Sequence, residues 1–536
     1  MSAPPIVLLS FSSKLWGRHE ELGVGYVAAA AEAAGYPVEV VTVDPESDEL
    51  FAFFSRTRNA PVLIGVAFSH AAISLEVLDT VLATCRTAVP TSHITAGGYF
   101  ATFNSERLLD ALPELDSVVV GEGEKTIVEL ADRLRAQRDL SELSGLRTRT
   151  HSYSPRAPIK DLDALEPPKR APVEAGLRSI FSLSTSRGCL AHCTFCNVPA
   201  WTRHHGGGWR GRSPVNIVDE LEGLTQMQPF PRVWVVDSSY EDSEIGGLQR
   251  IERIAEEILK RNLALRYYVF FRAETICEPD FSLVLPLLVE SGMRRVFVGV
   301  ETGDDQELKA FAKHSRAASN RAALEILRTA NVAVRAGWIM FTPQMQLEDL
   351  AAKLDQLEDF ELLHSTIDLF TCLEVYSGSS EVQKLRKLGF LHENAWHDPF
   401  AYDFADPRVD VLARAMVAIR TAEGHRWDGE ALHTTDLVIA AARHEITRAA
   451  ATDDTREMVN EADSKVSKIK RIQVAANRLF FEELIDLVAT RWDQSQFLSR
   501  VQQHVRDYHL PTARAARTVA AKLISDLGER GVQVHY

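Results

Sequence analysis

The chain has 536 residues, 46% of them apolar and 25% charged, which is ordinary for a globular protein with a sizeable core, and its length predicts about three domains. Its formal net charge of −15 (59 Lys and Arg against 74 Asp and Glu) argues against a broad nucleic-acid-binding surface. No stretch approaches the ~18 uninterrupted apolar residues of a membrane span, and no basic segment precedes an apolar run at the N-terminus, so we expect a cytoplasmic protein that binds neither membrane nor nucleic acid.

Residues 1–145 alternate short apolar runs with amphipathic segments. Strands are predicted at Ile6–Phe11, Val38–Val43, Val62–Phe68, Ser92–Ala96 and Ser117–Val120, and helices at Gly23–Gly35, Ile73–Arg86, Ser105–Ala111 and Glu124–Gln137. This alternation predicts a doubly wound parallel sheet, which binds ligands at the carboxyl ends of its strands. Glycines stand at two such ends: Gly97 and Gly98 follow the fourth strand, and Gly121 and Gly123 follow the fifth.

A dinucleotide-binding pattern, G-x-G-x-x-A, is present at Gly23–Ala28. That fingerprint needs its first glycine in the tight turn directly after the first strand. Here residues 12–22 intervene, so we reject NAD binding.

Residues 146–175 are polar and carry several prolines, in Arg156-Ala-Pro158 and Glu166-Pro-Pro-Lys-Arg-Ala-Pro172, which predicts a linker. From 176 to 392 a second strand–helix series follows, with strands predicted at Ile180–Ser184, Arg232–Val236, Arg266–Phe271, Arg295–Gly299, Ala333–Phe341 and Thr366–Tyr376. One of its helices should begin with Ser213 as N-cap and Pro214 in the first turn. In parallel barrels the reactive groups gather at the carboxyl ends of the strands.

Three cysteines follow the first strand of this series. Cys189, Cys193 and Cys196 have the spacing Cys-x3-Cys-x2-Cys. Three thiolates on one loop can hold three irons of a 4Fe–4S cluster and leave the fourth iron for a small chelating molecule. A disulfide is disfavoured in a chain with six cysteines and no secretory signal. Structural zinc stays open, with His192, His204 or His205 as fourth ligand, although no second cysteine pair accompanies the loop.

The cysteine loop, with Phe195 just before its last cysteine, resembles the signature of the radical S-adenosylmethionine (SAM) superfamily. Gly25-Tyr-Val-Ala-Ala-Ala30, Ala96–Thr102 and Val120–Glu124 resemble the cobalamin-binding domain of one large subclass of it. The resemblance implies an α/β fold with a cobalamin-binding-like Rossmann domain (1–145), a linker (146–175) and a partial (β/α)6 TIM barrel, the radical SAM domain (176–392). Helical periodicity at Asp410–Ala422, Asp436–Ala449 and Val466–Arg491 adds an α-helical C-terminal domain (393–536), which we expect to cover the barrel mouth.

The resemblance also implies site residues. In the superfamily, SAM chelates the fourth iron, and its reductive cleavage yields a 5′-deoxyadenosyl radical. The positions that match SAM contacts are Phe195 for adenine, Asp237 and Ser238 after the second strand, Arg272 after the third, Glu301 after the fourth as the best SAM ligand outside the cluster, and Arg335 for the SAM carboxylate. Ordinary barrel salt bridges are the alternative for each of these charged residues.

Cobalamin, if bound, would contact Ser69, Gly97, Gly98, Gly121 and Gly123, because glycines at strand ends let the backbone approach a flat macrocycle. No Asp-x-His-x-x-Gly follows the first strand, so no histidine is offered as lower axial ligand. A relic of the domain that no longer binds cobalamin is the alternative.

These expectations define a cobalamin-class radical SAM enzyme that methylates an unactivated carbon of a small natural-product intermediate. An external electron donor such as flavodoxin or ferredoxin is expected as its partner. A non-methylating radical SAM enzyme (dehydratase, epimerase or ring rearrangement) and an iron–sulfur or zinc-binding protein without catalysis are the alternatives. No residue that donates or accepts protons or hydrogen is identified.

Overall fold

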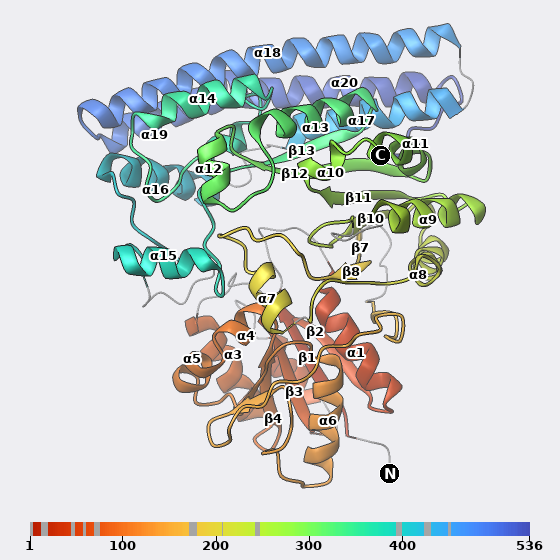
Figure 1. The fold of residues 1–536 in the computed structure, drawn as a ribbon, viewed down its shortest axis with the longest axis vertical. Coiled ribbons are helices and arrows are strands. Elements are labelled where there is room, and N and C mark those ends of the chain that lie inside the picture. The colour runs from red at the N-terminus through yellow and green to blue at the C-terminus, as the bar shows by residue number, and fades with distance from the viewer. Residues whose placement is uncertain are drawn as a thin grey trace.

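The computed structural model describes residues 4–11, 20–43, 49–56, 60–68, 75–170, 180–205, 207–241, 247–392, 399–422, 430–448 and 452–536. Within them, two mainly parallel sheets lie one above the other in Figure 1, and a layer of long helices lies beyond the second sheet. The mixed α/β class expected from the sequence is confirmed.

The first sheet has the strand order β2-β1-β3-β4-β5-β6. Its first five strands are parallel, and β6 runs antiparallel to β5. The bounds are β1 Ile6–Phe11, β2 Val38–Val43, β3 Leu63–Ala67, β4 His93–Gly97, β5 Ser117–Val119 and β6 Leu146–Thr148; the helices are α1 Leu22–Ala33, α2 Glu49–Arg56, α3 Leu75–Ala88, α4 Tyr99–Phe103, α5 Ser105–Ala111 and α6 Glu124–Arg135.

Separate apolar clusters cover the two faces of this sheet. Ile6 and Leu8 of β1 pack with α1 and α6, whereas Val7 and Leu9 pack with α2 and α3. Burial on both faces explains why β1 reads as an unbroken apolar run rather than an alternating one. The carboxyl edge of the sheet faces the second sheet, with α7 (Val198–His204) between them (Figure 1).

The second sheet has the order β13-β12-β11-β10-β7, and all its strands are parallel. Its strands are β7 Phe181–Leu183, β10 Arg232–Val235, β11 Arg266–Phe271, β12 Met293–Glu301 and β13 Ala333–Trp338; its helices include α8 Pro214–Met227, α9 Gly247–Lys260, α10 Ala273–Ile276, α11 Phe281–Glu290, α12 Asp305–Ala310, α13 Ala317–Thr329 and α14 Asp349–Asp359. A two-stranded ribbon, β8 Ser186–Arg187 with β9 Arg210–Gly211, flanks the cysteine loop. The predicted cap of α8 is confirmed, because the Ser213 side chain accepts from the backbone N–H of Asn216.

The sixth predicted strand, Thr366–Tyr376, does not form as such. The chain makes a 3-10 helix, η1 (Thr366–Phe370), and only Cys372 then pairs with Phe341 in an isolated parallel bridge. The Thr371 hydroxyl donates to the Asp368 carbonyl at 2.9 Å, a local side-chain-to-backbone bond that competes with strand pairing.

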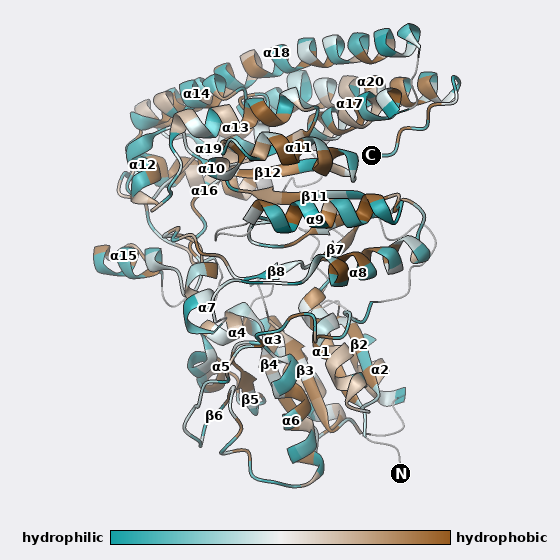
Figure 2. Cartoon of the chain, turned by 45° about the vertical axis from the view of Figure 1, so that its right-hand side comes forward, coloured by the Kyte–Doolittle hydropathy of each residue, from teal (hydrophilic) through white to brown (hydrophobic). Residues whose placement is uncertain are grey.

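Beyond α15 (Ser380–Leu388), the described residues are mostly helical: α16 Pro407–Ala422, α17 Glu430–Arg448, α18 Asp453–Thr490, α19 Gln494–His504, the π-helical turn η2 Val505–His509 and α20 Leu510–Gly528. Arg266, the first residue of β11, pairs with Glu445 of α17 at 2.5 Å, so α17 packs at the amino ends of the barrel strands and not at the carboxyl ends, where a cover over the barrel mouth was expected. Figure 2, coloured by hydropathy, shows polar and apolar residues interspersed along these long helices. Among the described residues, no helix is long and apolar enough to cross a membrane.

Candidate functional site

The cysteine loop lies between the two sheets and is held by the backbone on two sides. The Thr194 N–H donates to the Phe311 carbonyl at 3.0 Å, and the Glu381 N–H, from the start of α15, donates to the Thr194 carbonyl at 2.9 Å. Gly188 precedes the first cysteine at φ +95°, where a Cβ would lie 2.9 Å from the Gly208 carbonyl oxygen. The loop conformation is therefore specified by its neighbours and by one obligatory glycine.

The three thiols are free, and burial raises the pKa of each. The charges of Cys189 and Cys193 raise the pKa of Cys196 further, so the sulfurs lie near one another. Within the described part of the chain, however, they do not form a group whose ligand atoms all lie within 4.8 Å. A single zinc ion would hold its sulfurs about 3.8 Å apart, whereas a cubane cluster spreads them more widely. Three thiols on one loop, near one another but farther apart than ligands of a single ion, have the wider spread that a cubane cluster requires.

Charged groups from neighbouring strand ends surround the cysteines. Arg272, directly after β11, donates from Nε to Glu241 Oε1 at 2.8 Å. Burial, the larger effect, raises the pKa of Cys189, and the positive charge of Arg272 lowers it. After burial, the negative charge of Glu274 also contributes to the raised pKa of Cys193. The buried Oε2 atom of Glu274 has no hydrogen-bond partner among the described residues. An unpartnered buried carboxylate oxygen is costly in a folded protein and marks a place where a ligand group would be accommodated. Such an oxygen suits the ammonium group of an amino-acid ligand.

Glu301, the predicted SAM ligand, ends β12 in an unusual conformation. Its φ is +66°, and the register between β12 and β13 shifts between Gly299 and Glu301. A Cβ at Gly299 would lie 2.7 Å from Glu301 Oε1, and one at Gly337 would lie 3.3 Å from Glu301 Oε2. Two glycines therefore make room for this carboxylate. A non-glycine residue in the left-handed region costs energy, and such residues cluster at functional sites.

Lys313, which the sequence reasoning missed, holds the Glu301 carboxylate in place. Its Nζ donates to the Gly299 carbonyl at 2.6 Å and lies 3.4 Å from Glu301 Oε1. Burial opposes the charge of Lys313, but Glu301 and Cys193 outweigh burial and raise its pKa. No local pattern marks Lys313, because it follows the short helix α12 and only the fold brings it to the strand ends.

Asp237 and Ser238 follow β10 as predicted, but their surroundings differ. Asp237 is buried and accepts from the Thr185 N–H at 2.7 Å and from the Ser186 hydroxyl at 2.8 Å, so it braces the segment that leads into the cysteine loop. Burial raises the pKa of Asp237. Ser238 is exposed. Their contact with SAM stays a prediction.

Phe195 and Arg335 lie in different parts of the barrel. Phe195 packs edge-to-face on Phe311, with 5.4 Å between ring centroids, at the cysteine loop. Glu301 pairs with Trp338 at the end of β13, and Arg335 lies three residues earlier on the same strand, about 10 Å from Trp338. The Nη2 atom of Arg335 lies 3.7 Å from Asp368 Oδ1. The structure thus brings Phe195, Arg272 and Glu301 to one end of the barrel, and Arg335 lies deeper.

The glycines predicted for cobalamin line the carboxyl edge of the first sheet. Gly97 ends β4, and Gly98 has φ +108° at the start of α4. Gly121 has φ +87°, and a Cβ there would lie 3.8 Å from the Cβ of His205, the residue directly after α7. Gly123 directly precedes α6. Ser69 lies outside the described residues.

A buried ion-pair network joins this glycine edge to the cysteine loop. Arg187, two residues before Cys189, contacts Glu124 at 2.6 Å and Glu122 at 3.1 Å, and Arg210 contacts Glu122 at 2.8 Å. Burial alone would raise the pKa of Glu122, but Arg210 and Arg187 outweigh it and hold that pKa below its ordinary value.

An aromatic contact lies beside this network. Tyr99, which follows Gly98, packs on Trp201 of α7 with 4.3 Å between ring centroids. Burial, together with the nearby Cys196, raises the pKa of Tyr99 to about 12. The glycine edge and the cysteine loop are therefore neighbours in one junction.

Comparison with known proteins agrees with this arrangement. A family model described as the B12 binding domain matches residues 12–131. Over 339 residues the chain is 26% identical to 4'-phospho-dehydrooxetanocin synthase of Priestia megaterium, which covers 58% of this chain and 44% of that protein. Over 331 residues it is 28% identical to hopanoid C-3 methylase of Methylococcus capsulatus, covering 60% of this chain and 61% of the relative. The alignments span less than two thirds of either relative.

A solved structure shares the fold over nearly the whole chain. It is described as the cobalamin-dependent S-adenosylmethionine radical enzyme OxsB with aqua-cobalamin and S-adenosylmethionine bound, and it covers 98% of this chain and 80% of that chain, with a TM-score of 0.67 and 18% identity. The resemblance inferred from the cysteine loop and the glycine segments is confirmed.

Proposed function

We propose that this chain, a relative of the cobalamin-dependent radical SAM enzymes that carries a B12-binding domain, is an enzyme that uses a 4Fe–4S cluster, SAM and cobalamin together. The observation that carries the proposal is the junction in which Arg187 ties the cysteine loop to Glu122 and Glu124 at the glycine edge. A cofactor bound at that edge and a cluster in that loop would face the same space.

The residues divide among the three groups as follows. Cys189, Cys193 and Cys196 would ligate the cluster; Phe195, Asp237, Ser238, Arg272, Glu301 and Arg335 would contact SAM; Ser69, Gly97, Gly98, Gly121 and Gly123 would contact cobalamin. The unpartnered Glu274 oxygen and the Glu301 carboxylate fit the ammonium group of SAM, and the positive-φ glycines fit close approach of a flat corrin. Together the groups would supply a substrate radical and a methyl donor.

The corresponding layout is a cobalamin-binding domain at 1–145, a linker at 146–175, a partial (β/α)6 radical SAM barrel at 176–392 and a helical domain at 393–536. The oxygen sensitivity of an open cluster calls for a reducing compartment, for which we propose the cytoplasm. An external donor such as flavodoxin or ferredoxin would supply the electron.

For the reaction, we favour methyl transfer to an unactivated carbon of a small natural-product intermediate. One relative is named a methylase, which supports methylation. The other is named a synthase and not a methylase, and the second candidate is therefore a radical rearrangement, dehydration or epimerisation without methyl transfer. The residues around the cysteines serve both, since both begin with hydrogen abstraction from the substrate.

Anaerobic reconstitution tests the proposal. We expect about four irons and one cobalamin per chain, and 5′-deoxyadenosine release on reduction with SAM. Cys193→Ala should abolish that release. Zinc bound in place of iron, and lost in Cys193→Ala, would instead support a zinc-binding protein.

A panel of small-molecule substrates then separates the two reactions. S-adenosylhomocysteine formed together with 5′-deoxyadenosine supports methylation. Substrate-dependent 5′-deoxyadenosine alone supports the second candidate.

A further inference from the structure

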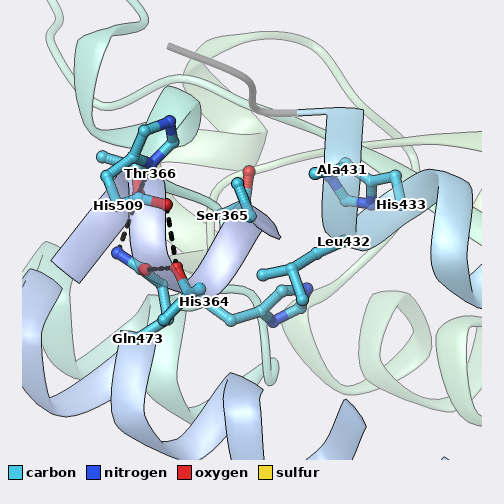
Figure 3. Close-up of a pocket in the computed structure, with 10 residues that line it drawn as sticks. His364, Ser365, Thr366, Ala431, Leu432, His433, Gln473 and His509 are labelled. Carbon is cyan, nitrogen blue, oxygen red and sulfur yellow. Dashed lines mark hydrogen bonds between the residues drawn. The ribbon is translucent and has the colours of Figure 1, made fainter. Parts of the chain in front are cut away.

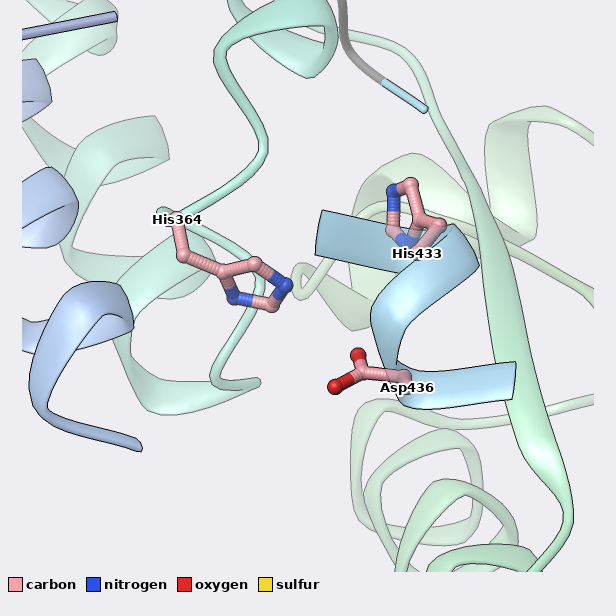
Figure 4. Close-up of side chains that lie close together, drawn as sticks. All are labelled: His364, His433 and Asp436. Carbon is pink, nitrogen blue, oxygen red and sulfur yellow. The ribbon is translucent and has the colours of Figure 1, made fainter. Parts of the chain in front are cut away.

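Three potential metal ligands converge at a place remote from the cysteine loop. His364 lies between α14 and η1, and His433 and Asp436 lie three residues apart on α17, so they share one face of that helix. Figure 4 shows the His364 ring directed toward α17, with the His433 ring and the Asp436 carboxylate turned toward it. Because the segment after α14 returns the chain to the amino ends of the strands, this cluster lies at the opposite end of the barrel from the cysteines.

The distances suit a single small ion. One ligand atom from each of the three side chains lies within 4.8 Å of the other two. A tetrahedral zinc ion, bound at about 2.0–2.1 Å, would hold its ligand atoms about 3.3 Å apart. Small side-chain rotations close that difference without moving the backbone.

A small cavity adjoins the two imidazoles. Its volume is about 10 Å3, and His364 and His433 line it together with Thr366, Gln473, His509 and Thr512 (Figure 3). That volume is about one water-sized probe. On the opposite wall, polar side chains hydrogen-bond to one another: Gln473 donates to the Thr366 hydroxyl at 3.1 Å and accepts from the Thr512 hydroxyl.

The side chains that line the cavity include Ser365 and His433, whose Oγ and Nε2 atoms are buried without a hydrogen-bond partner among the described residues, and His433 is the one of these two that belongs to the cluster. His433 is 7% exposed. Leaving a buried polar atom unpaired is unfavourable, and a metal ion at Nε2 would remove that cost.

We propose that His364, His433 and Asp436 bind one divalent transition-metal ion, of the zinc class, with a water in the cavity as its fourth ligand. Two neutral imidazoles and a carboxylate are a ligand set that zinc accepts. This site is independent of the cysteine loop and of the enzymatic proposal.

The surroundings orient one of the ligands. Lys470 Nζ holds Asp436 Oδ2 at 2.7 Å and leaves the other carboxylate oxygen for the ion.

The nearby cations have two effects. Burial is the main cause that lowers the pKa of both imidazoles. Lys470 lowers the pKa of His364 further, and Arg335 does the same for His433. Both rings are therefore kept neutral, as metal ligands must be. The same charges oppose any divalent cation equally, so the selectivity comes from the two imidazole ligands, which favour zinc-class ions over magnesium or calcium.

Bound there, the ion would join the connection after α14 to α17. It would thereby tie the C-terminal helices to the amino ends of the barrel strands, and its removal should destabilise the chain.

Elemental analysis of the full chain tests the site. Protein purified with zinc present should hold about one zinc per chain in addition to its iron, and a variant with all three loop cysteines changed to alanine should keep that zinc. His433→Asn and Asp436→Asn should each weaken zinc binding roughly 10-fold or more, with iron unchanged. His444→Asn, on the same helix and outside the cluster, is the matched control and should keep the metal.

A second measurement covers the case in which the variants fail to fold. Removal of zinc from the wild-type protein with a chelator should lower its melting temperature, and zinc, but not magnesium, should restore it. The proposal is overturned if wild-type protein binds no zinc in excess, if the zinc is lost with the loop cysteines, or if His433→Asn binds zinc like His444→Asn.

Discussion

Arg187 and Glu124 form a buried ion pair across the junction between the two sheets, with 2.6 Å between Nη2 and Oε1 and side chains that are 19% and 6% exposed. Arg187 belongs to the ribbon that leads into the cysteine loop, and Glu124 begins α6, directly after the glycine edge. The guanidinium also lies over the Tyr26 ring of α1, 5.1 Å from its centroid. One side chain thus connects the cysteine loop to two helices of the first sheet.

Arg187→Gln should lower the free energy of unfolding by about 3 kcal/mol, because it leaves the Glu124 carboxylate buried without its partner and removes one of the two arginines that pair with Glu122. Urea unfolding followed by circular dichroism measures the change. Arg135→Gln is the matched control: its pair with Asp132 is about half exposed, so its loss should cost less than about 1 kcal/mol. Equal effects of the two substitutions would show that the junction contributes no more than a surface pair.

Much of the architecture follows from local sequence. β1 and β2 have their predicted bounds, because apolar β-branched runs between turn residues carry their own signal. The cysteine loop and the glycines at strand ends were likewise visible, since each is a short motif whose chemistry lies within a few residues.

Other features depend on residues far apart in the chain. The Arg187–Glu124 pair spans 63 positions, and Lys313 reaches Glu301 only after α12 has turned back. The short helices α2 and α4 were missed, and so was the 3-10 turn at Thr366, where the Thr371 hydroxyl bonds locally to the Asp368 carbonyl. Sequence patterns report periodicity and not such pairings, so the contact of Arg335 with Asp368 was not visible in the sequence, and its contact with SAM stays a prediction.

Glu301→Gln should weaken SAM binding by about 1–3 kcal/mol while the absorption of the cluster stays intact, because one charge-assisted hydrogen bond is lost and the shape is kept. Equilibrium binding of SAM to the reconstituted protein measures the change. Glu278→Gln, at an exposed carboxylate, should leave the affinity unchanged. Wild-type affinity in Glu301→Gln would assign Glu301 to holding Lys313 alone.

Gly98→Val should block cobalamin uptake and spare iron, because a branched side chain at the carboxyl edge of β4 would occupy the space that the corrin needs. Gly98 has φ +108°, so the substitution also strains the backbone. Gly389→Val controls for strain, since Gly389 has φ +74° with nothing within 4 Å of an added Cβ. Cobalt and iron contents after reconstitution separate the effect on cobalamin binding from the effect of backbone strain. Full cobalamin uptake by Gly98→Val would show that cobalamin does not bind at this edge.

His504 predicts how stability depends on pH. The ring is buried, stacks on Phe480 at 4.3 Å, and has a pKa lowered to about 3, chiefly by burial and then by His509. An unfolded histidine titrates near pH 6.5, so below that pH the unfolded chain binds more protons than the folded one. The contribution of neutral, buried His504 to the free energy of unfolding is therefore complete above pH 6.5 and is lost as the pH falls toward 3.

At pH 5 the loss from His504 should be about 2 kcal/mol relative to pH 7.5. His504→Phe keeps the aromatic stack on Phe480 and removes the titrating group, so its unfolding free energy should fall less steeply between pH 7.5 and 5 than that of the wild type. His151→Phe, at a histidine whose side chain is 39% exposed, should follow the wild-type slope. Urea unfolding of the three proteins at pH 7.5, 6 and 5 gives the comparison. Parallel pH profiles for His504→Phe and the wild type would mean that His504 is accessible to protons in the folded chain.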